Sequence, residues 1–236
     1  MKKDIKEIKR KILEGEKLTS NEKQHYIKYA LTAGSDNGKM HDFTMITTSC
    51  LNNPLCIERR KIKGLICAEC YAAAQLEYQK TCREKMLINT LFFSKYELKP
   101  QDIPIIYTVN NVLRFDSHGD CVNRLNAKNY YTIARKNAHL HCAVWSKNPW
   151  FYKGLKKPNN LIFVFSISKV NRIITEKTLK QIKRKWSFVD KIFAVYDPQF
   201  IQENNITINC GGRDCMSCLT CYKSKTEKNL VFEQKK

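Results

Sequence analysis

The sequence predicts a mixed α/β fold with a parallel sheet that forms a partial or complete barrel of the TIM type. Three observations lead to this fold class. Short apolar runs with strand character recur at fairly even intervals, helical segments separate at least two of them, and polar residues gather directly after each run. Such alternation of strands and helices is typical of a parallel sheet with helices outside it.

Four apolar runs are the predicted strands. They are Val112 to Phe115, Cys142 to Trp145, Leu161 to Phe165 and Lys191 to Val195. Two further segments, Asn126 to Asn137 and Thr175 to Lys185, are predicted helices. These strands are too few to distinguish an open sheet from a closed eight-stranded barrel.

The N-terminal part is predicted to be a basic helical hairpin, residues 1–38, followed by the barrel-like domain at residues 39–236. Apolar residues at helical spacing predict a first helix from Lys2 to Leu13. A capping box from Thr19 to Glu22 predicts the start of a second helix that ends near Leu31.

Polar residues follow each predicted strand, at the edge where the loops of parallel α/β folds converge and form active sites. The sequence after the first strand is DSHGD, after the second SKN, and after the fourth YD, while Ser166, Ser168 and Asn171 follow the third. The candidate catalytic residues, which would position a substrate or move protons, are Asp116, His118, Asp120, Lys147 and Asp197. Since strand ends are exposed and polar in any case, each cluster also has a purely structural explanation.

The composition describes a folded and strongly basic chain. Of 236 residues 43% are hydrophobic and 11% are aromatic, which excludes a disordered chain. The 42 Lys and Arg against 22 Asp and Glu give a formal net charge of +20. The charge suits nucleic acid or a host protein as partner, and it is equally explained by the background composition of an AT-rich genome. Because no apolar run is long enough for a signal peptide or a membrane span, we expect a cytoplasmic protein without a membrane partner.

The cysteines of the C-terminal part point to a metal. The run CGGRDCMSCLTC places four thiols within 12 residues, in a loop expected to fold back to the carboxyl ends of the strands. Closely spaced cysteines in one irregular loop are typical of iron-sulfur clusters, whereas structural zinc sites usually have two separate pairs. We therefore expect a 4Fe-4S cluster, with zinc as the alternative, on Cys210, Cys215, Cys218 and Cys221. Gly211 and Gly212 would allow close backbone approach, and Arg213 would offset the negative charge of the cluster.

A second group of cysteines lies in residues 50–70. Cys67 and Cys70 precede a run without Gly or Pro, which predicts one long helix from Tyr71 to about Tyr96. Because a helix N-terminus stabilises a thiolate, these two cysteines are predicted metal ligands, and Cys50 and Cys56 are further candidates. The sequence does not show how the eight candidate cysteines are divided among sites.

These motifs together resemble a phage protein family. The succession of TTSC, CAECYAAA, LRFDSHGDCVN, VWSKNPWFY, FVFSISKVN and CGGRDCMSCLTCY, from about Thr44 to Tyr222, resembles the gene-product-eighty-eight-like proteins of bacteriophages and prophages. The CAECYA segment is also similar to the cysteine motif of the phage gene-product-thirty-seven/sixty-eight-like proteins, in which a radical-SAM-like barrel is suspected. The resemblance implies a phage or prophage origin, the host cytoplasm as location and a cysteine-bound metal cluster. Against the family's small-residue-Gly-Asp turn, His118 is a departure.

Two functions from different classes remain open at this point. The first is an iron-sulfur protein of radical-SAM-like architecture, in which a cluster with one iron not bound by cysteine would bind S-adenosylmethionine. The usual C-x3-C-x2-C loop is absent, which counts against that cofactor. The alternative is a basic protein that binds nucleic acid or a host partner and carries zinc or an iron-sulfur cluster only for stability. Whether the chain is an enzyme is left open.

Overall fold

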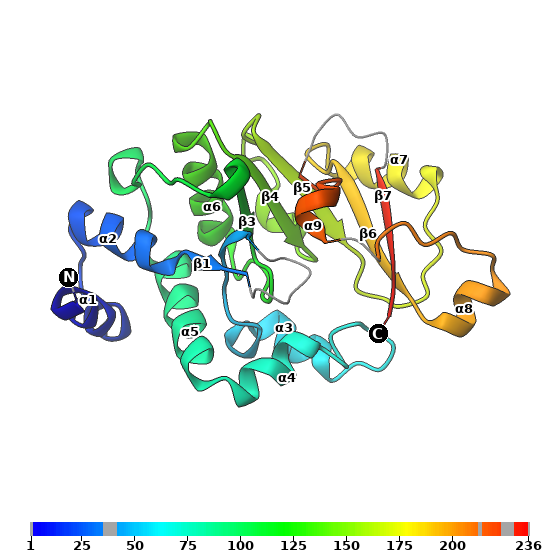
Figure 1. Cartoon of the computed structure of the whole chain (residues 1–236), viewed down its shortest axis with the longest axis horizontal. Helices are drawn as coiled ribbons and strands as arrows, with labels where there is room; N and C mark the ends of the chain where they lie inside the picture. Colours follow the sequence, from blue (N-terminus) through cyan, green and yellow to red (C-terminus); the bar gives the residue numbers. More distant parts are fainter. Residues whose placement is uncertain (1, 35–41, 212–213, 223–228, 236) are drawn as a thin grey trace.

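The computed structural model describes residues 2–34, 42–211, 214–222 and 229–235, and these form a seven-stranded sheet with helices around it (Figure 1). The strands lie in the order of the chain, and β2 to β7 are parallel, while β1 pairs with β2 in the antiparallel direction. Their bounds are β1 Thr32–Ala33, β2 Thr44–Ile46, β3 Val112–Phe115, β4 His141–Ser146, β5 Leu161–Ser166, β6 Lys191–Tyr196 and β7 Leu230–Gln234.

The helices of the described ranges connect and cover these strands. They are α1 Lys2–Glu14, α2 Ser20–Ala30, α3 Pro54–Arg60, α4 Tyr71–Tyr78, α5 Lys80–Lys95, α6 Arg124–Lys136, α7 Glu176–Lys185, α8 Pro198–Glu203 and α9 Cys215–Cys218. Short 3-10 helices lie at η1 Cys50–Asn52, η2 Pro100–Asp102, η3 Val109–Asn111 and η4 Pro149–Tyr152.

The predicted mixed α/β fold with a mostly parallel sheet is confirmed, and the four predicted strands are β3 to β6. The described strands do not close into a barrel, so a complete TIM barrel is not confirmed. The central strands consist almost entirely of apolar residues, because a parallel sheet is covered on both faces. The predicted helices at Asn126 to Asn137 and Thr175 to Lys185 correspond to α6 and α7.

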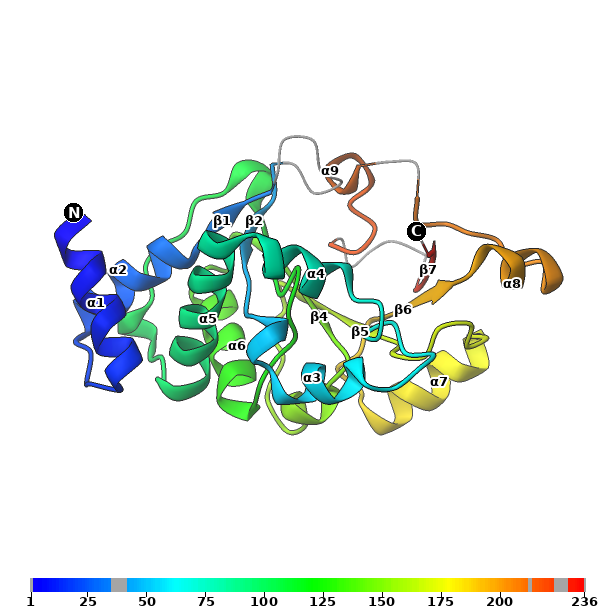
Figure 2. The same cartoon turned by 90° about the horizontal axis from the view of Figure 1, so that it is seen from below.

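The two faces of the sheet are covered differently. Helices α5, α6 and α7 lie on one face, and α9 with the cysteine-rich C-terminal segment lies on the other (Figure 2). On this second face, Tyr222 belongs to an apolar cluster with Phe43, Met45, Val112 and Ala143. Cys215 and Cys221 therefore pack over the sheet face and not at the expected carboxyl ends of the strands, whereas Cys210 lies beside Glu233 near the carboxyl end of β7.

The N-terminal helical hairpin joins the main core. The predicted capping box is present, since the Thr19 side chain accepts from the Glu22 amide and the Glu22 side chain accepts from the Thr19 amide. Ile8 and Ile12 of α1 and Tyr26 of α2 are buried in the same apolar cluster as the strands β3 to β5. The hairpin and the sheet thus share one hydrophobic core.

One predicted helix is divided in two. The run from Tyr71 to Tyr96 forms α4 and α5, and the helix breaks at Gln79, whose backbone is not helical (φ −93°, ψ 81°). The prediction of a single helix is therefore wrong. The break lets the two pieces pack differently: Ala72, Ala73 and Leu76 of α4 contact Cys50 and Cys56, while Phe92 and Phe93 of α5 are in the main core.

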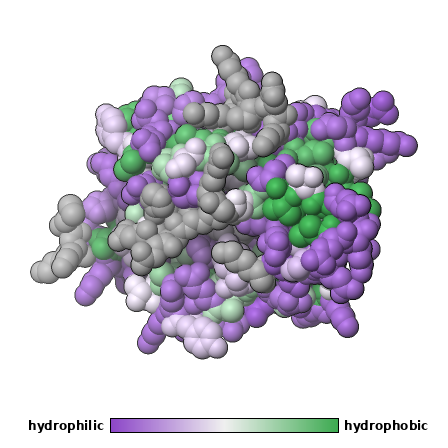
Figure 3. All heavy atoms as spheres, turned by 45° about the vertical axis from the view of Figure 1, so that its right-hand side comes forward, coloured by the Kyte–Doolittle hydropathy of each residue, from purple (hydrophilic) through white to green (hydrophobic). Residues whose placement is uncertain are grey.

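The last strand of the sheet is protected on its outer side by the chain itself. The Asn209 side chain donates to the carbonyl of Leu230 (2.9 Å) and accepts from the amide of Phe232 (2.8 Å). Partly buried apolar side chains such as Phe200 and Ile206 pack against the neighbouring core. Figure 3 shows an apolar area among hydrophilic residues on this end of the molecule.

Candidate functional site

The loops after β2, β3 and β4 meet at the carboxyl edge of the sheet. Asp116, directly after β3, holds the loop after β2: its Oδ1 accepts hydrogen bonds from the Thr48 amide (3.0 Å), the Thr48 hydroxyl (2.7 Å) and the Tyr130 hydroxyl (3.0 Å). Its other oxygen, Oδ2, is buried without a hydrogen bond. Burial raises the pKa of Asp116 to about 7, although the hydrogen bonds from Thr48 oppose the shift.

The turn after Asp116 lies directly on the loop after β2. A Cβ atom on Gly119 would be 2.3 Å from the Thr48 carbonyl oxygen, so only glycine fits there. Asp116 has a left-handed backbone (φ 54°), which aspartate tolerates better than most residues. The predicted polar cluster therefore sets the position of the chain segment that leads to Cys50.

Asp120 connects the β3 turn to the end of β4. Its Oδ1 accepts from the Ser146 hydroxyl (2.6 Å) and the Cys121 amide (2.7 Å), and its Oδ2 accepts from the Lys147 amide (2.8 Å). The side chain is 2% exposed, and burial raises its pKa. Asp120 and Lys147, two of the predicted catalytic residues, are thus neighbours.

The four cysteines of residues 50–70 belong to the single connection between β2 and α4, and they lie at this same edge. Cys50 is in η1, Cys56 is in α3, Cys67 is in the following turn, and Cys70 directly precedes α4. The Cys50 thiol donates to Cys70, which lowers the pKa of Cys70 to about 5, with help from backbone hydrogen bonds of Ala73 and Ala72 at the start of α4. The same contact and burial raise the pKa of Cys50.

Two cationic side chains face these thiols. For the Lys147 amine, burial lowers the pKa, while Asp120 and the sulfurs of Cys67, Cys56 and Cys70 raise it, and the net shift is upward. Arg59 donates from Nη2 to Asn148 Oδ1 (2.6 Å), and its Nη1 lies 3.8 Å from Asp120 Oδ2 and forms no hydrogen bond.

Arg59 is a site residue that was not among the candidate residues predicted from the sequence motifs. It lies three residues after Cys56 on α3, a spacing that places both side chains on one face of a helix. Both Lys147 and Arg59 lower the pKa of the Cys56 and Cys67 thiols against the dominant effect of burial, which leaves both values raised. The helical spacing was the signal that could have identified Arg59.

The other two predicted catalytic residues have different neighbours. His118 contacts Ser117 Oγ through Nδ1 (3.0 Å) and Gln75 Oε1 through Nε2 (3.0 Å), so it ties the β3 turn to α4. Asp197, after β6, accepts from Asn171 Nδ2 (2.8 Å) and pairs with Lys235 (3.4 Å). Burial lowers the pKa of His118, with a smaller effect from the nearby Arg114.

The C-terminal cysteines form a separate group on the face of the sheet that α9 covers. Burial raises the pKa of Cys221 to about 12, and Cys210, Cys215 and Arg114 are among the charged groups that act on it. Cys218 is exposed, and its sulfur lies 3.1 Å from the Thr220 hydroxyl.

Half-buried Arg114 connects this group to the sheet. Its guanidinium lies over the Trp145 ring (3.9 Å) and donates to the Tyr222 hydroxyl (3.3 Å). Of the predicted cluster-binding residues, Gly212 and Arg213 lie outside the described residues. No atom lies within 4 Å of the place that a Cβ of Gly211 would take.

The structure therefore divides the eight cysteines into two groups, which the sequence did not do.

Within the described ranges, no group of three or more His, Cys, Asp or Glu side chains could hold a metal ion as the side chains stand. In the same ranges, no helix is long and apolar enough to cross a membrane.

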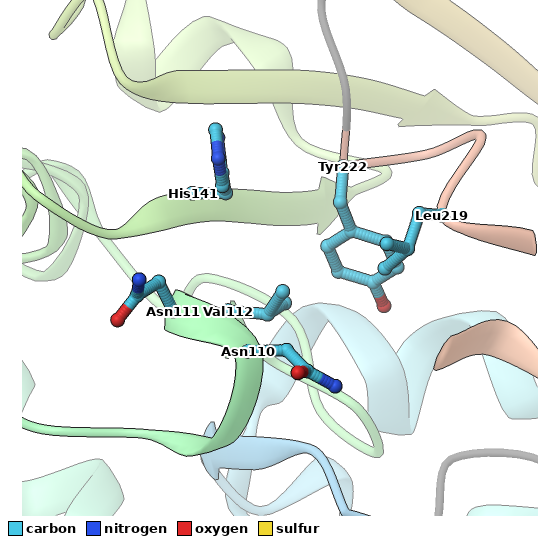
Figure 4. Close-up of a pocket in the computed structure, with 6 residues that line it drawn as sticks. All are labelled: Asn110, Asn111, Val112, His141, Leu219 and Tyr222. Carbon is cyan, nitrogen blue, oxygen red and sulfur yellow. The ribbon is translucent and has the colours of Figure 1, made fainter. Parts of the chain in front are cut away.

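Two cavities lie near these groups. One, of about 300 Å³, lies at the start of α4, and Arg60, Cys70, Tyr71 and Glu77 are among its lining residues. The other, of about 370 Å³, lies at the opposite end of β3 and β4, and its lining residues are Asn110, Asn111, Val112, His141, Leu219 and Tyr222 (Figure 4). The first cavity opens Cys70 of the carboxyl-edge group to solvent.

Comparison with known proteins adds no family to this picture: no family model, no curated protein and no solved structure matches the chain.

Proposed function

We propose that this chain is an iron-sulfur protein of radical-SAM-like architecture, with a cluster at the carboxyl edge of the sheet. The observation that carries the proposal is the convergence of Cys50, Cys56, Cys67 and Cys70, all from the connection after the first parallel strand, beside the cations Lys147 and Arg59. The strict chain order of β2 to β7 is the order that an open βα barrel requires. The resemblance adds a phage or prophage origin to this proposal.

The residues at this edge fit such a group by their chemistry. Thiolates are soft ligands that suit iron-sulfur clusters, and burial otherwise keeps the thiols of Cys56 and Cys67 neutral. Lys147 and Arg59 lie beside the carboxylate of Asp120, and Lys147 also lies beside Cys70, whose pKa is lowered to about 5. These two cations would offset part of the negative charge that ligand thiolates bring to the site. Because the thiols do not form a ready-made ion site, binding includes rotation of their side chains.

A bound cluster would supply electron transfer, and this chain's own residues would do the rest. Asp120 fixes the end of β4 through Ser146 and the Lys147 amide, and so orients the Lys147 amine toward the cysteines. Arg59 Nη1, buried without a hydrogen bond, is available to donate to a ligand sulfur. Hydrogen bonds of this kind raise the reduction potential of a cluster.

We propose a second metal site on the C-terminal group. Its thiols would be held by α9 and the described residues next to it, with half-buried Arg114 and buried Lys191 offsetting their charge. Iron-sulfur is the proposed occupant here as well, and zinc is the alternative that the first experiment decides.

The test is anaerobic purification followed by analysis of iron, zinc and acid-labile sulfide, a visible spectrum and electron paramagnetic resonance with and without S-adenosylmethionine. We expect iron and sulfide in cluster stoichiometry. Zinc without sulfide would reject the iron-sulfur assignment and leave a metal-stabilised binding protein. A change of the resonance spectrum on adding S-adenosylmethionine would identify one iron as open to that cofactor, despite the absence of the usual three-cysteine loop.

Single substitutions assign the two sites. Cys67→Ser is expected to remove the iron of the carboxyl-edge site only, and Cys221→Ser that of the C-terminal site only, because the two groups lie in different places. Cys142→Ser, at a cysteine of β4 that lies in the main core outside both groups, is the matched control and should keep all iron. Full iron content in the Cys67→Ser protein would contradict the role of the carboxyl-edge site.

A further inference from the structure

Some basic regions of the molecule are neutralised by ion pairs, and others are not. In the N-terminal hairpin, Lys9, Arg10, Lys11 and Lys23 all pair with acidic side chains. α7 lies at the opposite end of the molecule (Figure 1), and none of its residues has an ion pair within the described part of the chain. The hairpin, although basic in sequence, is therefore a partly neutralised surface.

Six exposed cations form what we call the basic strip: Lys63, Lys169, Arg172, Lys177, Lys180 and Arg184. None of them has an ion pair within the described part of the chain. Unpaired cations that lie near each other repel, and this repulsion destabilises the folded chain. Water screens the repulsion on a well-hydrated surface, and an anionic partner removes it.

Backbone contacts bring the members of the basic strip together. The Val170 amide donates to the Gly64 carbonyl (3.0 Å), and the Ile66 amide donates to the Ser168 carbonyl (2.8 Å), so the loops of Lys63 and Lys169 lie side by side. The chain then passes Arg172 and enters α7. There the remaining three cations lie at positions i, i+3 and i+7, along one side of the helix.

We infer that the basic strip binds the phosphate backbone of a nucleic acid without reading its sequence. A lipid surface is disfavoured because the apolar side of α7 is used within the fold, where Leu179 is buried and Ile182 is packed on the core. An acidic protein is disfavoured because protein interfaces have an apolar centre, whereas the strip is polar and cationic, as nucleic-acid interfaces are. A row of separate cations suits a linear polyanion.

The basic strip lies beside the proposed metal site, but binding along the strip does not require a metal. Lys63 lies in the loop between Cys56 and Cys67, so a strand bound along the strip would pass beside the carboxyl edge of the sheet. The binding itself rests only on surface cations, and it is expected with or without a metal.

The test measures binding of a fluorescein-labelled single strand of mixed sequence, and of the same sequence as a duplex, over a range of salt concentrations. For the variant Lys169→Gln, Arg172→Gln, Lys180→Gln, each lost phosphate contact should reduce the slope of log K against log salt by about 0.7 to 0.9. At moderate salt this corresponds to a total loss of affinity of at least about tenfold. The sequence of the probe should have no effect.

The matched control carries the same change of charge on the hairpin: Lys6→Gln, Lys17→Gln, Lys28→Gln, at exposed positions of the opposite end. It should bind like the wild type. Equal losses of affinity in both variants would show that only net charge matters and would overturn the inference. A wild type that binds neither probe, or that prefers poly-glutamate, would also overturn it. The Cys67→Ser protein should bind as tightly as wild type, so a failure of the metal proposal and a failure of this inference are separate results.

Discussion

Gly119 illustrates at the scale of one residue how the turn after β3 determines the position of the cysteine loop. A Cβ there would meet the Thr48 carbonyl oxygen at 2.3 Å, and this atom belongs to backbone held by Asp116. Gly119→Ala must therefore shift the turn or the loop, and we expect it to destabilise the fold by about 1–3 kcal/mol. Denaturant unfolding measures the loss.

Gly15→Ala is the control for this substitution. Gly15 has a left-handed backbone (φ 75°) with no atom within 4 Å of a Cβ, so its cost comes from backbone strain alone, about 1 kcal/mol. The Gly119 variant should in addition bind less iron at the carboxyl-edge site. A Gly119→Ala protein as stable as wild type would contradict the close contact with Thr48.

Individual site residues were predictable from sequence to different degrees. Asp120 and Lys147 were identified because each lies in the polar segment that follows a strand with a clear apolar run, and the structure brings them together. Asp116 was identified for the same reason, yet its hydrogen bonds hold the Thr48 loop. Arg59 was missed because its partners come from β3 and β4, far away in sequence, and only its spacing from Cys56 is local.

At the scale of elements, the outer edge of β7 is held by the Asn209 side chain together with the backbone amide of Cys210, which donates to the Phe232 carbonyl (2.9 Å). Asn209 satisfies the Phe232 amide and the Leu230 carbonyl, which would otherwise be open on an edge strand. Asn209→Ala is expected to cost about 1 kcal/mol and to speed hydrogen exchange at the Phe232 amide. The control is Asn204→Ala, whose side chain donates only to Phe200 in its own helix. Unchanged exchange at Phe232 in the Asn209 variant would show that the edge is protected by other means.

Prediction of the elements succeeded where the local pattern was long enough. The strands β3 to β6 have four to six apolar-rich residues, and each was predicted to within a residue or two. The strands β1 and β2 have only two and three residues, too few for a periodic signal, so the first parallel strand was missed. The break at Gln79 was also invisible, because it arises from the packing of α4 on Cys50 and Cys56 and not from a local breaker.

At the scale of the whole molecule, the grouping of the eight cysteines depends on topology. Cys50 to Cys70 follow the missed strand β2, which places them at the carboxyl edge, while Cys215 and Cys221 pack on the face of the sheet that α9 covers. Cysteine spacing states which thiols are close along the chain and nothing about the position of one group relative to the other. The two proposed sites could therefore be separated only by the fold.

The last prediction concerns the pH dependence of the stability of the whole molecule. The pKa of Asp116 is about 7 in the fold, well above the usual value of 3.8, so between these values the folded state holds a proton that the unfolded state has lost. The contribution of Asp116 is complete below the lower value and is lost as the pH rises through about 7. Cys70 acts in the opposite direction, since its lowered pKa of about 5 adds stability as the pH rises toward 9.

The variant Asp116→Asn isolates the first contribution, because asparagine cannot titrate and tolerates the left-handed backbone. We expect the free energy of unfolding of the wild type, relative to the variant, to fall by up to about 4 kcal/mol between pH 4 and pH 8. Denaturant unfolding of both proteins at a series of pH values gives this difference directly. If the difference in free energy of unfolding between the two proteins does not change with pH, Asp116 has an ordinary pKa. Water would then reach Oδ2, and the carboxyl edge would be more open to solvent than the fold indicates.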